Sequence, residues 1–172
     1  FTTVQYHFYR MRDSGLLDVI NEALVTTARL VSGREECPTA GIVDSQSVKT
    51  TESGGPRGYD AGKKVKGRKR HIVTDTEGNV LALTTHAADI QDRDGGSEVI
   101  EQACESYPDL ACIFADGGYA GNKLRQAVAA FDGPTIEIVR RPHAVNGFVV
   151  ITRRWVVERT FAWLGRCRRL AK

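Results

Sequence analysis

The sequence has few of the residues that define metal-binding and disulfide-bonded proteins. Only 4 of its 172 residues are cysteine, and no two have the CxxC spacing of zinc or redox motifs. The 4 histidines are equally scattered. This dispersal argues against a zinc site, and we expect the cysteines to be structural thiols.

Long apolar runs are also lacking. No stretch approaches the roughly 18 residues of a membrane-spanning helix, and the N-terminus does not have the order of a signal peptide. We therefore expect a cytoplasmic protein with no membrane partner. Because the chain starts at Phe1 rather than Met and stops within a basic helical pattern, we also expect it to be a piece of a longer protein.

Positive charge is concentrated in two blocks. The net charge is only +3, yet residues 57–71 contain seven Lys or Arg and one acid, and residues 153–172 have the same count. The rest of the chain is therefore acidic. Two such blocks indicate a localised contact with a polyanion, although either block alone could be a solvated basic face.

Apolar spacing divides the chain into a helical segment, residues 1–36, and a mixed region, residues 37–172. The first segment predicts two short helices separated by an Asp-Ser-Gly break. The second predicts a mixed sheet flanked by helices, and so an α/β fold. Its expected elements are a strand at 40–49, a basic loop at 50–69, a hairpin at 70–88, a helix at 92–107, a strand ending at Asp116, a helix at 122–131, a strand at 135–141 and a helix at 154–170.

Two predicted strands run into an aspartate. Ile42 and Val43 precede Asp44, and the apolar run 112–115 precedes Asp116. In neighbouring parallel strands both acids would emerge at the same edge of the sheet. Each would raise the pKa of the other, so a hard divalent cation is the natural third partner. The simpler interpretation of Asp44 is a turn residue that closes its strand.

A third acid, Glu158, lies on the predicted C-terminal helix. At helical spacing it shares one stripe with Arg154, Ala162, Gly165 and Arg169. The small residues would let a ligand approach, and arginine binds phosphate in bidentate fashion. The alternative for Glu158 is an ion pair with Arg154 on a solvated face.

The other side of this helix is apolar. We expect it to pack on the sheet, with Trp155 and Trp163 in the core rather than stacked on an extruded base. Three carboxylates suit Mg²⁺ or Mn²⁺ better than zinc. Two such ions, about 3.5 to 4 Å apart, can activate an attacking hydroxyl and stabilise the leaving oxygen of a phosphodiester.

Three long motifs resemble the DDE transposases of bacterial insertion sequences, in the insertion-sequence-five group. They are "DSQSVKTTESGGPRGYDAGKKVKGRKRHIVTDTEGNVLALTTHAAD", "FADGGYAG" and "RRWVVERTFAWLGRCRRLAK". The resemblance covers nearly the whole chain. It implies an RNase H-like core cut short at its C-terminal end, and Asp44, Asp116 and Glu158 as a catalytic triad that binds two Mg²⁺ or Mn²⁺ ions.

The resemblance also implies partners and a reaction. Family enzymes bind the terminal inverted repeats of their element as double-stranded DNA, hydrolyse strands there and join the freed 3′ hydroxyl to target DNA. We expect a homodimer or higher assembly on DNA, located at the nucleoid when bound. The predicted DNA contacts are basic residues of the two blocks and the first strand: Lys49, Lys63, Lys64, Lys66, Arg68, Lys69, Arg70, Arg154, Arg166 and Arg169.

The chain departs from the family signature of Tyr, Arg, Glu and Lys around the glutamate helix. Arg154 and Glu158 match, whereas Ile151 stands at the tyrosine position and Gly165 at the lysine position. Arg166 or Arg169 could substitute for the missing lysine in the phosphate contact. Two other functions stay open: an RNase H-like nuclease that cuts without joining, and a DNA-binding relic without turnover. Residues 1–36 are either an end-binding or dimerisation segment or a simple helix pair.

Overall fold

The computed structural model describes residues 2–50, 55–140, 154–167 and 170. The chain divides into two compact units, Phe1–Cys37 and Pro38–Lys172, and each is described by itself. None of the helices in these ranges is long and apolar enough to cross a membrane.

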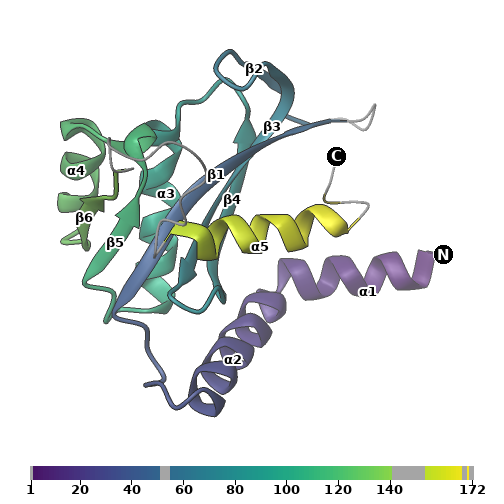
Figure 1. Ribbon diagram of the computed structural model, residues 1–172. Helices are drawn as coiled ribbons and strands as arrows, with labels where there is room; N and C mark the ends of the chain where they lie inside the picture. Colours follow the sequence, from purple (N-terminus) through teal and green to yellow (C-terminus); the bar gives the residue numbers. More distant parts are fainter. Residues whose placement is uncertain (1, 51–54, 141–153, 168–169, 171–172) are drawn as a thin grey trace. The chain divides into compact units, whose positions relative to one another are not determined.

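The first unit consists of two helices, α1 (Thr2–Asp13) and α2 (Leu16–Val31), as the sequence predicts (Figure 1). Gly15 separates them in a left-handed conformation with φ 71°, which suits a residue without a Cβ. Within this unit only Val25 and Arg29 are buried among the described residues. The use of this unit for end binding or dimerisation stays a prediction.

The second unit is built on one mixed sheet of six strands. They are β1 (Ala40–Lys49), β2 (Gly58–Asp60), β3 (Val65–Asp75), β4 (Val80–Ala87), β5 (Cys112–Ala115) and β6 (Thr135–Ile138). The order is β2-β3-β1-β5-β6, with β4 also paired to β3. Strands β1, β5 and β6 are parallel, whereas β3 is antiparallel to β1, β2 and β4.

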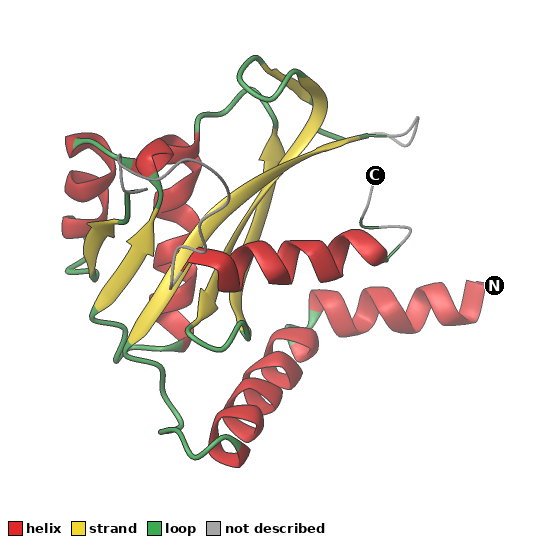
Figure 2. Cartoon of the chain, viewed as in Figure 1, coloured by secondary structure: helices red, strands yellow, loops and turns green. Residues whose placement is uncertain are grey.

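Helices cover both faces of this sheet (Figures 1 and 2). Helix α3 (Asp92–Ser106) and helix α4 (Asn122–Ala129) lie on one face, and α5 (Arg154–Arg166) lies on the other. On the α5 side, the buried core joins Ile42, Ile72 and Phe114 of the sheet to Val156, Val157 and Phe161 of the helix. The arrangement is the mixed, helix-flanked sheet expected for an RNase H-like core.

The predicted basic loop at residues 50–69 is partly wrong. It contains β2 and the first residues of β3, which pair as a hairpin. Gly67 of β3 lies so close to β1 that an added Cβ would be 1.9 Å from the carbonyl oxygen of Val48. The backbone of this part of β3 pairs with a strand on each side, and this pairing keeps it extended. Its side chains show no alternation of apolar and polar residues that would have predicted a strand.

The expected burial of the two tryptophans is also wrong. Trp155 and Trp163 are 40% and 55% exposed. The guanidinium of Arg159 lies over both rings, 4.6 and 4.8 Å from their centroids. Thr160 is buried on this helix instead and donates to the carbonyl oxygen of Gly78 in the β3–β4 turn. The helix is therefore rotated so that its aromatic residues stack with an arginine at the surface.

One histidine of β3 is completely buried. His71 shares a 2.8 Å hydrogen bond between Nδ1 and the hydroxyl of Tyr119, and its ring lies 4.7 Å from that of His86. Burial, and next the neighbouring His86, lower its pKa from 6.5 to about 3, against the opposing charge of Asp92. His71 is therefore neutral in the folded protein at pH values where it binds a proton in the unfolded chain.

This difference predicts a pH-dependent stability. As the pH falls from 6.5 towards 3, the unfolded state gains a proton that the folded state does not, and stability falls by at most about 1.4 kcal/mol per pH unit. Urea unfolding across this range, compared between the unaltered chain and His71→Gln, isolates the contribution. The variant should depend less on pH; an identical dependence would contradict the assignment.

The core of α5 predicts a second effect. Phe161→Ala removes a ring that is 5% exposed and packs on the sheet, which should lower the free energy of unfolding by about 3 to 5 kcal/mol. The neighbouring exposed residue gives a matched control, Ala162→Ser, expected to change it by no more than about 0.5 kcal/mol. Equal effects in denaturant unfolding would mean that α5 does not pack as described.

Candidate active site at the edge of the sheet

Asp44 lies in the middle of β1, so the expectation that it ends its strand is wrong. The parallel ladder with β5, however, has its last pair at Ile42 and Phe114. Beyond that pair β1 continues beside β3 alone, with Asp44 opposite Ile72. Asp116 directly follows β5. Both aspartates therefore stand just past the end of the parallel pairing, at one edge.

The backbone holds one oxygen of each aspartate. Asp44 Oδ1 accepts a hydrogen bond of 2.7 Å from the N–H of Ser45, and Asp116 Oδ1 accepts one of 2.7 Å from the N–H of Gly118. Asp116 thereby caps a short 3₁₀ turn, η1 (Gly117–Tyr119). The oxygens Oδ2 of both acids stay available for a further partner.

That partner is Arg154 at the start of α5. Its Nη2 atom lies 3.7 Å from Asp44 Oδ2, 3.7 Å from Asp116 Oδ2 and 3.4 Å from Glu158 Oε1. The structure therefore brings together all three predicted carboxylates around a single nitrogen atom. Arg154 and Glu158 also form the i, i+4 ion pair that was the alternative interpretation of Glu158. This ion pair is part of the carboxylate cluster and does not lie on a separate, solvated face of the helix.

The carboxylate of Asp44 is in an unfavourable place for a charge. Burial raises its pKa from 3.8 to about 6. The N–H of Ser45 opposes that rise, Asp116 adds to it, and Arg154 and Lys63 oppose it. A cation beside Asp44 therefore favours the charged form of the group.

The donor set fits a hard divalent cation, because all three groups offer carboxylate oxygens. Within the described ranges, no three His, Cys, Asp or Glu side chains are grouped so that they could hold an ion as they stand. Arg154 lies between the three acids instead. Its guanidinium stands where a metal ion bound by the three carboxylates would lie, so a metal centre here requires that this side chain move.

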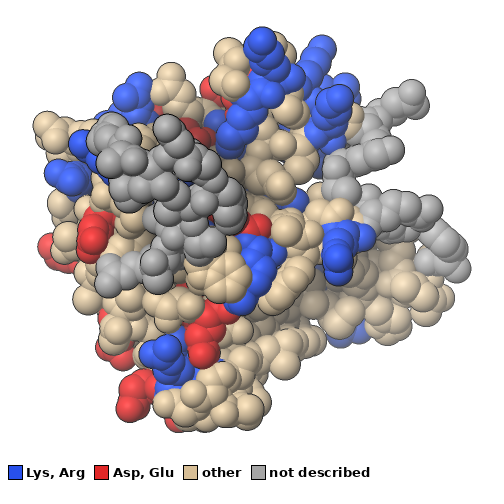
Figure 3. Space-filling model, viewed as in Figure 1, with Lys and Arg blue, Asp and Glu red and all other residues tan. Residues whose placement is uncertain are grey.

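Several predicted DNA contacts are accessible. Lys and Arg side chains gather around the β2–β3 hairpin on the face seen in Figure 3. Among the predicted residues, Lys49, Lys64, Lys66 and Arg166 are exposed, Arg68 is half-buried and Arg154 is at the acid cluster. Lys63 is also exposed, but its Nζ donates to the carbonyl oxygen and the hydroxyl of Ser45. Arg169 and Ile151 lie outside the described residues.

Two other predicted contacts are corrected. Lys69 and Arg70 are only 4% and 6% exposed. Lys69 forms an ion pair of 2.8 Å with Asp92, and Arg70 donates to Gln46 and to the carbonyl oxygen of Leu170. Their positive charges have partners within the protein, so neither is available to a DNA backbone in this conformation.

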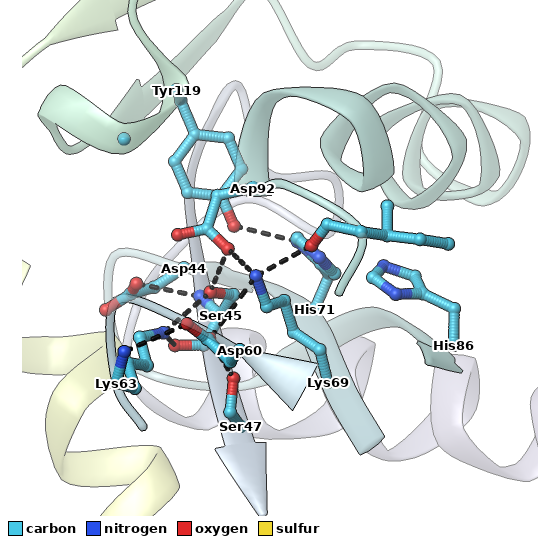
Figure 4. A network of polar contacts seen from close by, with 12 residues as sticks. Asp44, Ser45, Ser47, Asp60, Lys63, Lys69, His71, His86, Asp92 and Tyr119 are labelled. Carbon is cyan, nitrogen blue, oxygen red and sulfur yellow. Dashed lines mark hydrogen bonds and ion pairs between the residues drawn. The ribbon is translucent and has the colours of Figure 1, made fainter. Parts of the chain in front are cut away.

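Sequence reasoning missed a polar network on the opposite face of β1 (Figure 4). It comprises Ser45, Asp60, Lys63, Lys69 and Asp92, and we call it the Asp92 network. Asp92 stands in the first turn of α3, where acids are common, so its position in the sequence does not single it out. Strand alternation does not mark Lys69, because β3 buries the residues of both alternating sets from 69 to 73.

Known proteins are similar to this chain over most of its length. Residues 35–172 match the family model described as the transposase DDE domain. The putative transposase for insertion sequence element IS402 of Burkholderia cepacia is 30% identical over 136 residues, which are 75% of this chain and 62% of that protein. The chain therefore spans less than two thirds of that relative.

A solved structure, the Mos1 transposase paired-end complex with left transposon end, aligns with 69% of this chain and 39% of its own. The identity is 8% and the TM-score 0.36, a likeness too low to bear on function. The match of the family model extends over four fifths of the chain and includes all three acids of the cluster. The chain belongs to the transposase DDE domain family.

Proposed function

We propose that this chain is the catalytic core of a DNA transposase, which cleaves strands at the ends of its element and joins them to target DNA with divalent metal ions. The observation that supports this best is the convergence of Asp44, Asp116 and Glu158 on one nitrogen atom of Arg154. Membership of the transposase DDE domain family makes cutting of a nucleic acid the expected chemistry.

In this proposal Asp44 and Asp116 would hold both ions, Mg²⁺ or Mn²⁺, and Glu158 would hold the second. When bound, the ions activate the attacking water or 3′ hydroxyl and stabilise the leaving oxygen. Glu158 has a side chain that is 54% exposed, so it can adjust its position more easily than Asp44, at 15%. Arg154, once displaced from the acids, would be free to bind a backbone phosphate.

The proposed partner is double-stranded DNA. The exposed lysines of the β2–β3 hairpin supply contacts that do not depend on base sequence. We place the protein in the cytoplasm, on the nucleoid when bound, and working as a homodimer or higher assembly. Residues 1–36 are proposed to serve that assembly or the binding of element ends.

The triad predicts a loss of activity in three variants. Asp44→Asn, Asp116→Asn and Glu158→Gln should each lower metal-dependent cleavage and joining by at least about a hundredfold, since a bound metal ion contributes several kcal/mol. Labelled DNA with the ends of the source element is the substrate, with MgCl₂ or MnCl₂. A matched control is Glu101→Gln, at an exposed site on α3.

Each outcome identifies one of the alternatives. Shortened products without joined products would indicate a nuclease that does not transfer strands. DNA binding by the unaltered chain without any cleavage would favour the relic. Full activity in any one triad variant would exclude that residue from the metal centre.

The exposed hairpin predicts a change in salt dependence. Lys64→Ala or Lys66→Ala should reduce the slope of log affinity against log salt by about one, at all DNA sequences equally. A suitable control is Lys123→Ala, because Lys123 is exposed but already pairs with Asp94 at 2.7 Å. Affinity measured by fluorescence anisotropy over a salt series gives the slope. Unchanged slopes in both hairpin variants would place the DNA on another surface.

A further inference from the structure

We propose that Asp92 is a positioning residue for the metal centre, which fixes the carboxylates of Asp44 and Asp116 relative to one another through the Asp92 network. The inference rests on the proposed function of that centre. Asp92 is the first residue of α3, on the face of the sheet opposite α5. It is joined to the elements that hold both aspartates.

The link to Asp44 runs through the next residue of β1. Ser45 is 7% exposed, and its hydroxyl donates a hydrogen bond of 2.8 Å to Asp92 Oδ1. The N–H of the same serine donates to Asp44 Oδ1 at 2.7 Å. One residue thus touches Asp44 with its backbone and Asp92 with its side chain, so a shift of Ser45 moves the donor that orients Asp44.

The link to Asp116 is a close packing contact. A Cβ added at Gly118 would lie 3.0 Å from Asp116 Oδ1 and 3.2 Å from Asp92 Oδ2. Gly118 itself donates its N–H to Asp116 Oδ1. Asp92 therefore lies against the turn that holds Asp116, and its second oxygen faces that turn.

Asp92 is itself held firmly. Lys69 Nζ, on a side chain that is 5% exposed, lies 2.8 Å from Asp92 Oδ1 and 3.5 Å from Asp60 Oδ2, and it donates to the carbonyl oxygen of Ile90 at 2.7 Å. Burial alone would raise the pKa of Asp92, but the hydrogen bonds from Lys69 and Ser45 outweigh it and hold the pKa below its ordinary value. A charged, fixed carboxylate is a rigid support.

This support is valuable because metal ligands must keep their geometry within about 0.5 Å. Residues that orient ligands without touching the ion typically change metal affinity by about 10- to 100-fold when they are replaced. A buried ion pair could instead serve the fold alone. The two roles differ in one measurable respect: only positioning changes metal affinity in a variant that is still folded.

The test is a titration of the full chain with Mn²⁺ alone, followed by electron paramagnetic resonance of the free ion. Asp92→Asn keeps the shape of the side chain and removes its charge, whereas Ser45→Ala removes one hydroxyl and leaves the ion pair of Lys69 and Asp92. Each should weaken Mn²⁺ binding by about 10- to 100-fold, while DNA binding in EDTA is unchanged. Ser45→Thr, which restores a hydroxyl, should recover affinity.

Two further variants sharpen the result. If both residues act through one network, the double variant should bind Mn²⁺ no more weakly than the weaker single variant, a non-additive effect. Asp94→Asn is the matched control, in the same first turn of α3 but paired with the exposed Lys123. It should bind Mn²⁺ as the unaltered chain does.

Asp44→Asn in the same titration separates the two proposals. If it abolishes Mn²⁺ binding while Asp92→Asn and Ser45→Ala bind as tightly as the unaltered chain, the positioning role is overturned and the metal centre stands. Lower melting temperatures with unchanged affinity would also overturn it and leave the network a purely structural one. If the unaltered chain binds no Mn²⁺, the metal centre and the positioning role both fall.

Discussion

The burial of a carboxylate, Asp44, beside a second acid is the constraint on which the candidate site depends. Asp44, Asp116 and Glu158 come from two strands and a helix, and they meet where burial already raises the pKa of Asp44 to about 6. Positive charge beside Asp44 offsets burial and the charge of Asp116, and so favours the charged form of this carboxyl. In this conformation Arg154 supplies that charge, and the parallel pairing of β1 with β5 and the packing of α5 hold the acids in reach of it.

Consecutive side chains of β1 serve different functions because they point to opposite faces of the sheet. Asp44 is directed to the face covered by α5, where it meets Arg154, and Ser45 is directed to the face covered by α3, where it meets Asp92. Neighbouring residues on a strand point to opposite faces. A ligand position and its support can therefore be adjacent in sequence and still lie in different layers. The same alternation on β3 sends Lys69 towards Asp92 and Arg70 towards Gln46.

Much of the site could be predicted because an apolar run directly precedes each of the two aspartates. The run before Asp116 predicted a buried strand, and the parallel pairing of that strand with β1 ends two residues before each aspartate. The burial of Lys69 and Arg70 could not be predicted in this way, since a run of charges gives no apolar period from which to infer direction. The exposure of Trp155 and Trp163 was missed for a related reason: an arginine between them, Arg159, replaces core contacts by stacking.

The departure from the family signature at Gly165 has a clear local consequence. A Cβ added there would meet nothing within 4 Å, so the helix does not need glycine at this position for packing. The space around this position is open, so packing does not exclude a larger side chain there. Arg166 is the next residue and is exposed, but consecutive residues of a helix point to different sides. A basic residue at position 165 would stand on the stripe of Glu158, whereas Arg166 stands beside that stripe.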